Sequence, residues 1–147
     1  MEIAILGLGC FWGPEIKFSK LDGIIKTEVG YCGGDNKQTT YKEVCSGTTN
    51  HAEVVKLDFD PKIITYEKIL EFFFDIHDPT TLNSQGPDFG TQYRSEIFYL
   101  NDNQKKVAEE IKNKNNDRLS GKIVTKISLV KNYCPAEEYH QRYLEKR

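Results

Sequence analysis

The sequence lacks the features that mark several large classes of protein. Its 20 lysine and arginine residues are balanced by 22 acidic ones, and no stretch gathers the excess positive charge that binding to a nucleic acid requires. The first residues contain no basic segment followed by a long apolar run, so we expect neither a signal peptide nor a membrane-spanning helix. These absences argue against nucleic-acid and membrane partners and predict a cytoplasmic protein.

Internal repeats and low-complexity linkers are also missing. A chain of 147 residues is close to the commonest domain size and can bury one core without disulfides or metals. We therefore expect one catalytic or binding domain over residues 1–147, and a monomer.

Cysteine is present but does not form a Cys-x-x-Cys pair. The four cysteines are Cys10, Cys32, Cys45 and Cys134. In a reducing cytosol, reduced or catalytic thiols are expected in preference to two disulfides. The three histidines have no recognised metal-ligand spacing with these thiols, so the sequence predicts no metal and no cofactor.

Strand and helix patterns alternate along the chain. Alternating or β-branched runs predict strands over Glu2–Leu6, Ile24–Tyr31, Ala52–Phe59, Ser95–Leu100 and Ile123–Val130. Helical spacing, capping residues and early prolines predict helices over Pro14–Leu21, Tyr66–His77, the stretch after Asn101, and Pro135–Leu144. This order predicts an α+β fold, a two-layer α/β sandwich with a ferredoxin-like (split βαβ) core, a mixed sheet and flanking helices. Residues 77–94 have neither period, and long irregular loops are often functional.

One cysteine stands at a turn in the stretch "GLGCFWGPE". Cys10 follows the first predicted strand and precedes a helix that Pro14 can start, so unpaired helix amides should face its sulfur and favour the thiolate. The alternative is a small buried hydrophobic residue, which is what most unpaired cysteines are. Two adjacent aromatic residues, Phe11 and Trp12, cannot easily both enter one core, so at least one should line a cleft.

Other polar residues stand out on a strand and in a loop. Glu53 begins a strand of apolar alternation, and an inward-facing carboxyl there would have a raised pKa and could donate a proton. A solvent-facing strand end explains the same pattern equally well. The loop "NSQGPDFGTQYRSE" carries Asp88 and Tyr93, and a loop tyrosine can reach a substrate or simply pack.

Five stretches together carry a resemblance to a known family. They are "GCFWGPE", "EVGYCGGD", "TYKEVCSGTTNHAEVV", "HDPTTLNSQGPDFGTQYRSEIFY" and "CPAEEYHQRYL". In order and over nearly the whole chain, they resemble peptide methionine sulfoxide reductase of the A type. The resemblance implies an α/β sandwich with a ferredoxin-like core, and reduction of the S epimer of methionine sulfoxide, free or in proteins, as repair after oxidative damage.

The resemblance also implies roles for individual residues. Cys10 corresponds to the nucleophile and Glu53 to the catalytic acid, while Tyr41 and Tyr93 match the hydroxyls that hold the sulfoxide oxygen. Further substrate contacts are implied for Phe11 and Trp12, around the methyl group, and for Asp88, at the substrate backbone. Attack by Cys10 would release methionine and leave a sulfenic acid, the first product of cysteine oxidation.

Two other classes use some of the same features. A thiol peroxidase or disulfide oxidoreductase would also have a reactive cysteine, but it needs no aromatic methyl pocket, and this sequence has no Cys-x-x-Cys. A ferredoxin-like ligand-binding module without activity is the second alternative.

The fate of the sulfenic acid is a separate question, because no cysteine follows the "YHQ" motif. Many members of the family carry resolving cysteines there. Cys32 and Cys134 could replace them only if either brings its Cα within about 7 Å of that of Cys10. Cys45, in the predicted short helix "YKEVCSG", is interpreted as a structural thiol. We therefore expect an external thiol, either thioredoxin or glutathione with glutaredoxin, to recycle the enzyme.

Overall fold

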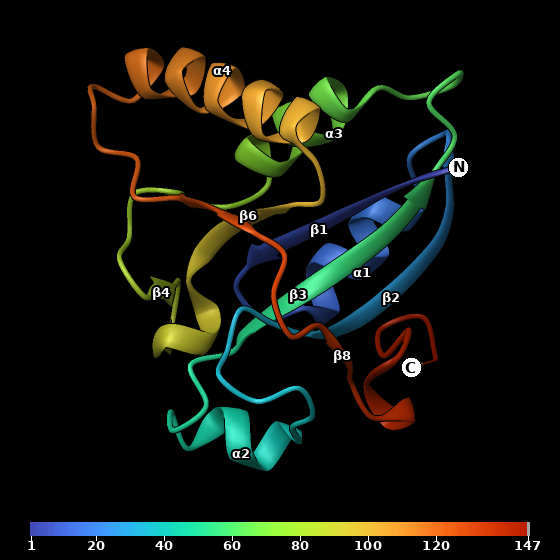
Figure 1. Ribbon diagram of the computed structural model, residues 1–147, viewed down its shortest axis with the longest axis vertical. Helices are drawn as coiled ribbons and strands as arrows, with labels where there is room; N and C mark the ends of the chain where they lie inside the picture. Colours follow the sequence, from blue (N-terminus) through green and yellow to red (C-terminus); the bar gives the residue numbers. More distant parts are fainter. Residues whose placement is uncertain (147) are drawn as a thin grey trace.

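A six-stranded mixed sheet forms the centre of the computed structural model, which describes residues 1–146 (Figure 1). The strand order is β7-β6-β1-β3-β2-β8. The strands are β1 (Glu2–Leu8), β2 (Ile24–Cys32), β3 (Ala52–Phe59), β6 (Ser95–Tyr99), β7 (Lys126–Leu129) and β8 (Cys134–Pro135). Strand β3 is antiparallel to both β1 and β2, so β1 and β2 run in the same direction with β3 between them. This is the predicted split βαβ arrangement, and β6 on the other side of β1 completes the ferredoxin-like core.

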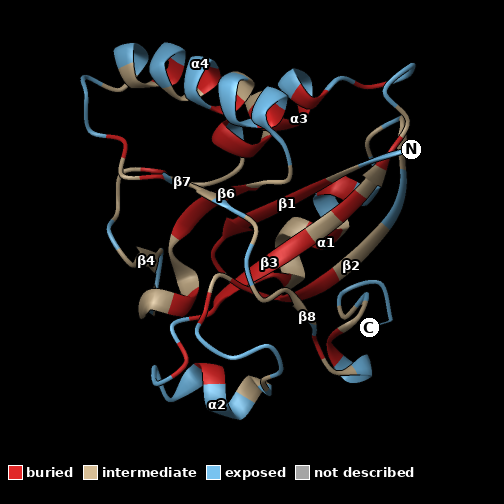
Figure 2. Ribbon diagram, in the orientation of Figure 1, coloured by how far each residue is buried: buried red, intermediate tan, exposed pale blue. Residues whose placement is uncertain are grey.

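Three helices pack their apolar residues against one face of this sheet. They are α1 (Trp12–Ser19), α3 (Tyr66–Asp75) and α4 (Asp102–Arg118). Leu6 and Leu57 from the sheet share one buried cluster with Phe18 of α1, Phe73 of α3 and Ile111 of α4. Figure 2 shows the buried strands β1 and β3 beneath helices whose outer faces are exposed. The two-layer α+β prediction is therefore confirmed.

Capping residues start the two long helices where the sequence predicts them. The Thr65 side chain accepts a hydrogen bond from the Lys68 amide, and Asn101 accepts one from the Gln104 amide. Among the described residues, no helix is both long and apolar enough to cross a membrane.

The predicted C-terminal helix over Pro135–Leu144 is wrong. The chain instead forms β8 and a short 3-10 helix, Glu138–His140. The Gln141 side chain accepts from the Val29 amide and donates to the Val29 carbonyl, and the Ala136 amide also donates to that carbonyl. These bonds fasten the segment to β2. Arg142 then has a φ of 48°, which an α-helix does not allow.

Several other elements differ in extent from the predictions: β1 continues to Leu8, for example, and α3 ends at Asp75 and not at His77. The last long strand covers only Lys126–Leu129, not Ile123–Val130. The irregular stretch 77–94 contains a small hairpin, β4 (Ser84–Gln85) and β5 (Asp88–Phe89), followed by a 3-10 helix, Thr91–Tyr93. A further helix, α2 (Tyr41–Cys45), forms at the expected place.

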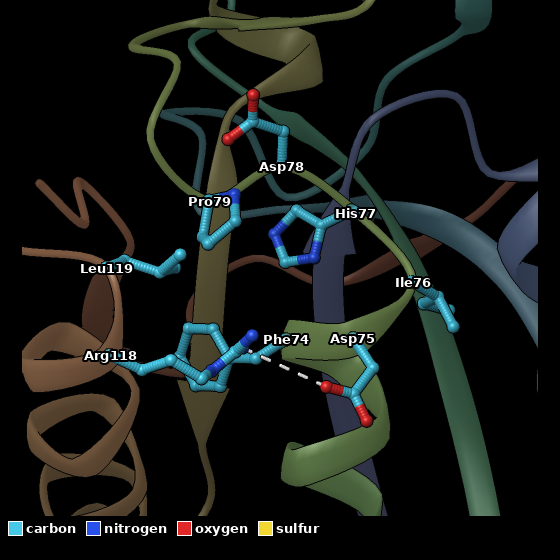
Figure 3. Close-up of a pocket in the computed structure, with 8 residues that line it drawn as sticks. All are labelled: Phe74, Asp75, Ile76, His77, Asp78, Pro79, Arg118 and Leu119. Atoms are coloured by element: carbon cyan, nitrogen blue, oxygen red, sulfur yellow. Dashed lines mark ion pairs between the residues drawn. The ribbon is translucent and has the colours of Figure 1, made fainter.

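A half-buried histidine joins the end of α3 to strand β6. His77 Nδ1 lies against the Phe73 carbonyl, so it must carry the proton, and Nε2 accepts from Ser95 Oγ at 2.8 Å. Thr125 Oγ1 then donates to Ser95 Oγ at 2.7 Å. His77 also lines an open hollow of about 450 Å³, across which Arg118 faces Asp75 at 3.9 Å (Figure 3).

Burial lowers the pKa of His77 to about 4 from an ordinary value of 6.5. Below pH 6.5 His77 is therefore protonated in the unfolded chain, whereas in the folded chain it stays neutral down to about pH 4. The free energy of unfolding falls as the pH drops through this range. At about 1.4 kcal/mol per pKa unit, the loss by pH 4.5 is roughly 2–3 kcal/mol. We expect His77→Gln, which cannot ionise, to lose that much less stability than the wild type between pH 7 and 4.5 in urea unfolding. Identical losses for both proteins would contradict this.

Candidate active site

Cys10 lies in the turn between β1 and α1, at the end of the sheet where β3 begins. Gly9 before it has a φ of 98°, and a side chain there would meet Gln85 at 2.8 Å, so the turn requires glycine. The Cys10 side chain is half-buried, and the Trp12 backbone amide donates a hydrogen bond to its sulfur.

The helix amide does not leave Cys10 ionised, and this corrects the sequence-based expectation of a favoured thiolate. Burial raises the pKa of Cys10 to about 11, the Trp12 amide lowers it by less, and the charges of Glu53 and Asp88 raise it further. At neutral pH Cys10 is therefore a thiol in the free protein. Its ionisation depends on the charge of its neighbours.

Glu53 faces inward from β3 and is 1 % exposed. Its Oε1 accepts from the Phe11 amide at 3.3 Å, and its Oε2 accepts from Gln92 Nε2 at 3.1 Å. Burial raises the pKa of Glu53 to about 7, although both donors oppose the rise and Asp88 adds to it. The carboxyl is thus partly protonated at neutral pH, which suits a proton donor.

Two tyrosines face this carboxyl from different elements. Tyr41 opens α2, and Tyr93 ends the 3-10 helix beside Gln92. Burial is the main cause that raises the pKa of Tyr93 to about 12 and that of Tyr41 higher still, and the negative charge of Glu53 contributes to both. The two side chains also hydrogen-bond to each other. Both phenols remain protonated at neutral pH and can donate to an oxygen atom.

The two aromatic residues after Cys10 point in different directions. Phe11 is buried against Tyr31 and His140. Trp12 is half-buried, and its ring stacks on Tyr143 at 3.8 Å between centroids. Its indole nitrogen donates to His140 Nδ1 at 3.2 Å. Trp12 is therefore the partly exposed one of the two aromatic residues, in line with the prediction that Phe11 and Trp12 do not both enter the core.

Asp88, on β5, is near enough for its charge to raise the pKa of Cys10, Glu53 and Tyr93. The structure therefore gathers seven residues named from the sequence around one point. They are Cys10, Phe11, Trp12, Tyr41, Glu53, Asp88 and Tyr93.

The two cysteines considered as resolving thiols lie elsewhere. Cys32 pairs with Ala52 across β2 and β3 and belongs to the cluster on the sheet face opposite the helices, whereas Glu53 faces the helix side with Tyr31. Cys134 lies on β8, and strands β3 and β2 stand between β8 and β1. Since neighbouring strands are about 4.8 Å apart, neither position favours a direct disulfide with Cys10.

Three residues that complete the site were not predicted to belong to it. Gln92 holds Glu53, and His140 holds Trp12. Cys45, interpreted as structural, has its sulfur 3.3 Å from Gln92 Nε2. The sequence signal for Gln92 is its place directly before Tyr93 in "GTQYRS", where its side-chain amide can donate to a neighbouring group.

The ferredoxin-like sheet places a thiol next to a buried, partly protonated carboxyl and two phenol donors. This combination defines the protein as a thiol-dependent enzyme of the α+β class. The family model described as peptide methionine sulfoxide reductase matches residues 2–147. This chain belongs to the peptide methionine sulfoxide reductase family, as a peptide-methionine (S)-S-oxide reductase.

Individual relatives agree with this assignment. The chain is 82% identical to the peptide methionine sulfoxide reductase MsrA of Pelagibacter ubique (strain HTCC1062), with 100% of both chains covered. It is 51% identical to the MsrA of Methanothermobacter thermautotrophicus, covering 99% of this chain and 87% of that one. Among solved structures, Mxr1 from Saccharomyces cerevisiae in reduced form matches with a TM-score of 0.95 and 45% identity, covering 99% of this chain and 85% of Mxr1.

The charge of Glu53 should control the ionisation of Cys10. Glu53→Gln removes a negative charge that raises the pKa of the thiol, so the pKa of Cys10 should fall in this variant. The measurement is the rate of iodoacetamide alkylation at Cys10 against pH, followed by mass spectrometry of the peptide. Glu71→Gln, on α3 where the carboxylate pairs with Lys114 of α4, is the matched control and should leave the profile in place. A Cys10 profile that does not move in Glu53→Gln would refute the coupling.

Proposed function

We propose that Cys10 is the nucleophile and Glu53 the proton donor in the reduction of methionine S-sulfoxide. The observation that carries this proposal is the hydrogen bond from the Phe11 amide to Glu53 Oε1 at 3.3 Å. It joins the residue directly after Cys10 to the acid, so one substrate sulfoxide can meet both groups.

The reaction needs both groups because a sulfoxide sulfur becomes a good electrophile only when its oxygen is protonated or tightly hydrogen-bonded. Glu53 gives a proton to that oxygen as Cys10 reacts, and the proton of the thiol restores the acid. Cys10 sulfur attacks the activated substrate sulfur, and as this adduct collapses the bond from the substrate sulfur to oxygen breaks and the oxygen passes to Cys10 sulfur. The substrate sulfur gains two electrons, Cys10 loses two, and the products are methionine and a Cys10 sulfenic acid.

The other residues of the site orient the substrate. Tyr41 and Tyr93, as neutral phenols, donate to the sulfoxide oxygen, and Trp12 with Phe11 contacts the methyl group. These contacts fix the configuration at sulfur and support selection of the S epimer. A burial of one methyl group contributes only about 0.8 kcal/mol, whereas a positioned general acid is worth ~10²–10⁴ in rate. Asp88 is proposed to bind the substrate backbone.

Recycling by an external thiol is supported by the positions of the other cysteines. Neither Cys32 nor Cys134 is placed for a direct disulfide with Cys10, and this supports attack on the sulfenic acid by a soluble thiol. Mxr1 from Saccharomyces cerevisiae has been solved in complex with Trx2, and that structure matches this chain with a TM-score of 0.70 and 30% identity, covering 97% of this chain and 84% of Mxr1. We propose thioredoxin as the reductant, with glutathione and glutaredoxin as the alternative, and a monomer that acts in the cytoplasm on free or protein-bound methionine sulfoxide.

Cys10→Ser should abolish the activity while leaving the fold intact, because serine keeps the size but not the nucleophilicity. The assay supplies methionine S-sulfoxide and dithiothreitol and measures methionine released. Cys134→Ser is the matched control and should retain turnover. Activity above a few per cent in Cys10→Ser would place the nucleophile elsewhere, and equal turnover of the R epimer would contradict an oriented methyl site.

The recycling route can be tested in a single turnover. Reduced protein is mixed with methionine sulfoxide without reductant, and the products are mapped by mass spectrometry with dimedone as a sulfenic acid trap. We expect a dimedone adduct on Cys10. Rapid, stoichiometric formation of a disulfide between Cys10 and Cys134 or Cys32 would overturn the external route.

A further inference from the structure

We propose that Gln92 is the positioning residue of the catalytic acid: its side-chain amide holds the Glu53 carboxyl in one orientation. The proposal rests on the role of Glu53 as acid given above. Nothing in the sequence motifs assigned Gln92 a function.

Gln92 is placed rigidly by the turn that carries it. Its side chain is buried, and it lies in the middle of the 3-10 helix Thr91–Tyr93. The next residue but one, Arg94, fastens this turn with three donors. They reach the Thr91 carbonyl at 2.9 Å, the Asn50 carbonyl at 3.0 Å and the Glu96 carboxylate at 2.6 Å. The amide therefore approaches Glu53 from a fixed backbone.

Both amide hydrogens of Gln92 have an acceptor. Nε2 lies 3.1 Å from Glu53 Oε2 and 3.3 Å from Cys45 Sγ. A rotated amide would direct its carbonyl oxygen at the carboxylate and lose both contacts. The thiol of Cys45 thus helps to set the amide orientation, and Glu53 is held at each oxygen by a different segment of the chain.

The amide acts against the effect of burial. A donor to a carboxylate stabilises its charged form, and Gln92 is the largest cause that lowers the pKa of Glu53. Without it, the pKa of Glu53 should rise above about 7, which makes the group a weaker acid. The other titratable groups that act on Glu53, or that its charge affects, are Cys10, Tyr31, Tyr41, Asp88 and Tyr93, and all of them remain in a Gln92 variant.

The test replaces Gln92 with methionine, which has a similar length but no donor. The Glu53 carboxyl is titrated directly by ¹³C NMR of glutamate-labelled protein, and its signal is assigned by its loss in Glu53→Gln. We expect the midpoint to rise by about half a pH unit or more.

The alkaline limb of the kcat profile should move to higher pH with the Glu53 midpoint, because activity is lost when the acid is deprotonated. On the acidic plateau, where Glu53 is protonated in both proteins, kcat should fall about tenfold because the carboxyl is no longer held in one orientation, with KM nearly unchanged. Gln38→Met, the same change in an exposed loop, should alter neither quantity.

A second pair of variants tests the orientation without touching Gln92. Cys45→Ser keeps an acceptor for the amide and should leave the Glu53 midpoint in place, whereas Cys45→Ala removes it and should shift the midpoint in the same direction as Gln92→Met. This pair remains informative if Gln92→Met does not fold.

The outcomes separate the two proposals. An unchanged Glu53 midpoint in folded Gln92→Met, or equal midpoints in the two Cys45 variants if Gln92→Met fails to fold, overturns the role of Gln92. A midpoint that rises while the kcat profile stays in place shows that Glu53 is not the acid, and then the proposed mechanism fails although the hydrogen bond acts as described.

Discussion

The burial of one carboxyl group at the start of the central strand is the constraint on which the site depends. Glu53 is almost fully shielded from water, and a buried carboxylate is costly unless donors reach it. Its two donors, the Phe11 amide and the Gln92 side chain, come from segments 42 and 39 residues away. Satisfying Glu53 therefore brings the Cys10 turn and the loop carrying Tyr93 to the same end of the sheet.

The same burial couples the charges of the thiol and the acid. Cys10 and Glu53 each lose solvation in the site, and each negative charge opposes the other, so the free protein disfavours the state in which both are ionised. At neutral pH the thiol is protonated, and the carboxyl is protonated in a part of the molecules. Both protons are then available when a sulfoxide oxygen arrives, and Tyr41 and Tyr93 add two further donors at that oxygen without changing the charge.

Local patterns predicted the elements whose causes are local. Side-chain alternation gave strand β3 with its bounds, and the capping residues Thr65 and Asn101 gave the starts of α3 and α4. For Cys10 the sequence left both a favoured thiolate and a buried thiol open, because the helix amide is visible in the sequence whereas the burial that outweighs it is not. Gln92 was missed for a related reason, since its partner Glu53 is distant in sequence and only the fold brings them together.

The C-terminal segment shows why a local helical pattern can be overridden by contacts with distant parts of the chain. In an α-helix, Glu137, His140 and Gln141 would project from one face, because residues three and four apart are neighbours. In the structure they reach three different elements. Glu137 accepts from the Tyr41 amide of α2 at 3.0 Å, His140 accepts from the Trp12 indole of α1, and Gln141 binds the backbone of β2 at Val29. No single helix face could make all three contacts. Because the segment is not helical, it contacts both α2, which carries Tyr41, and Trp12 of α1. These are the two side chains proposed to hold the oxygen and the methyl group of the substrate.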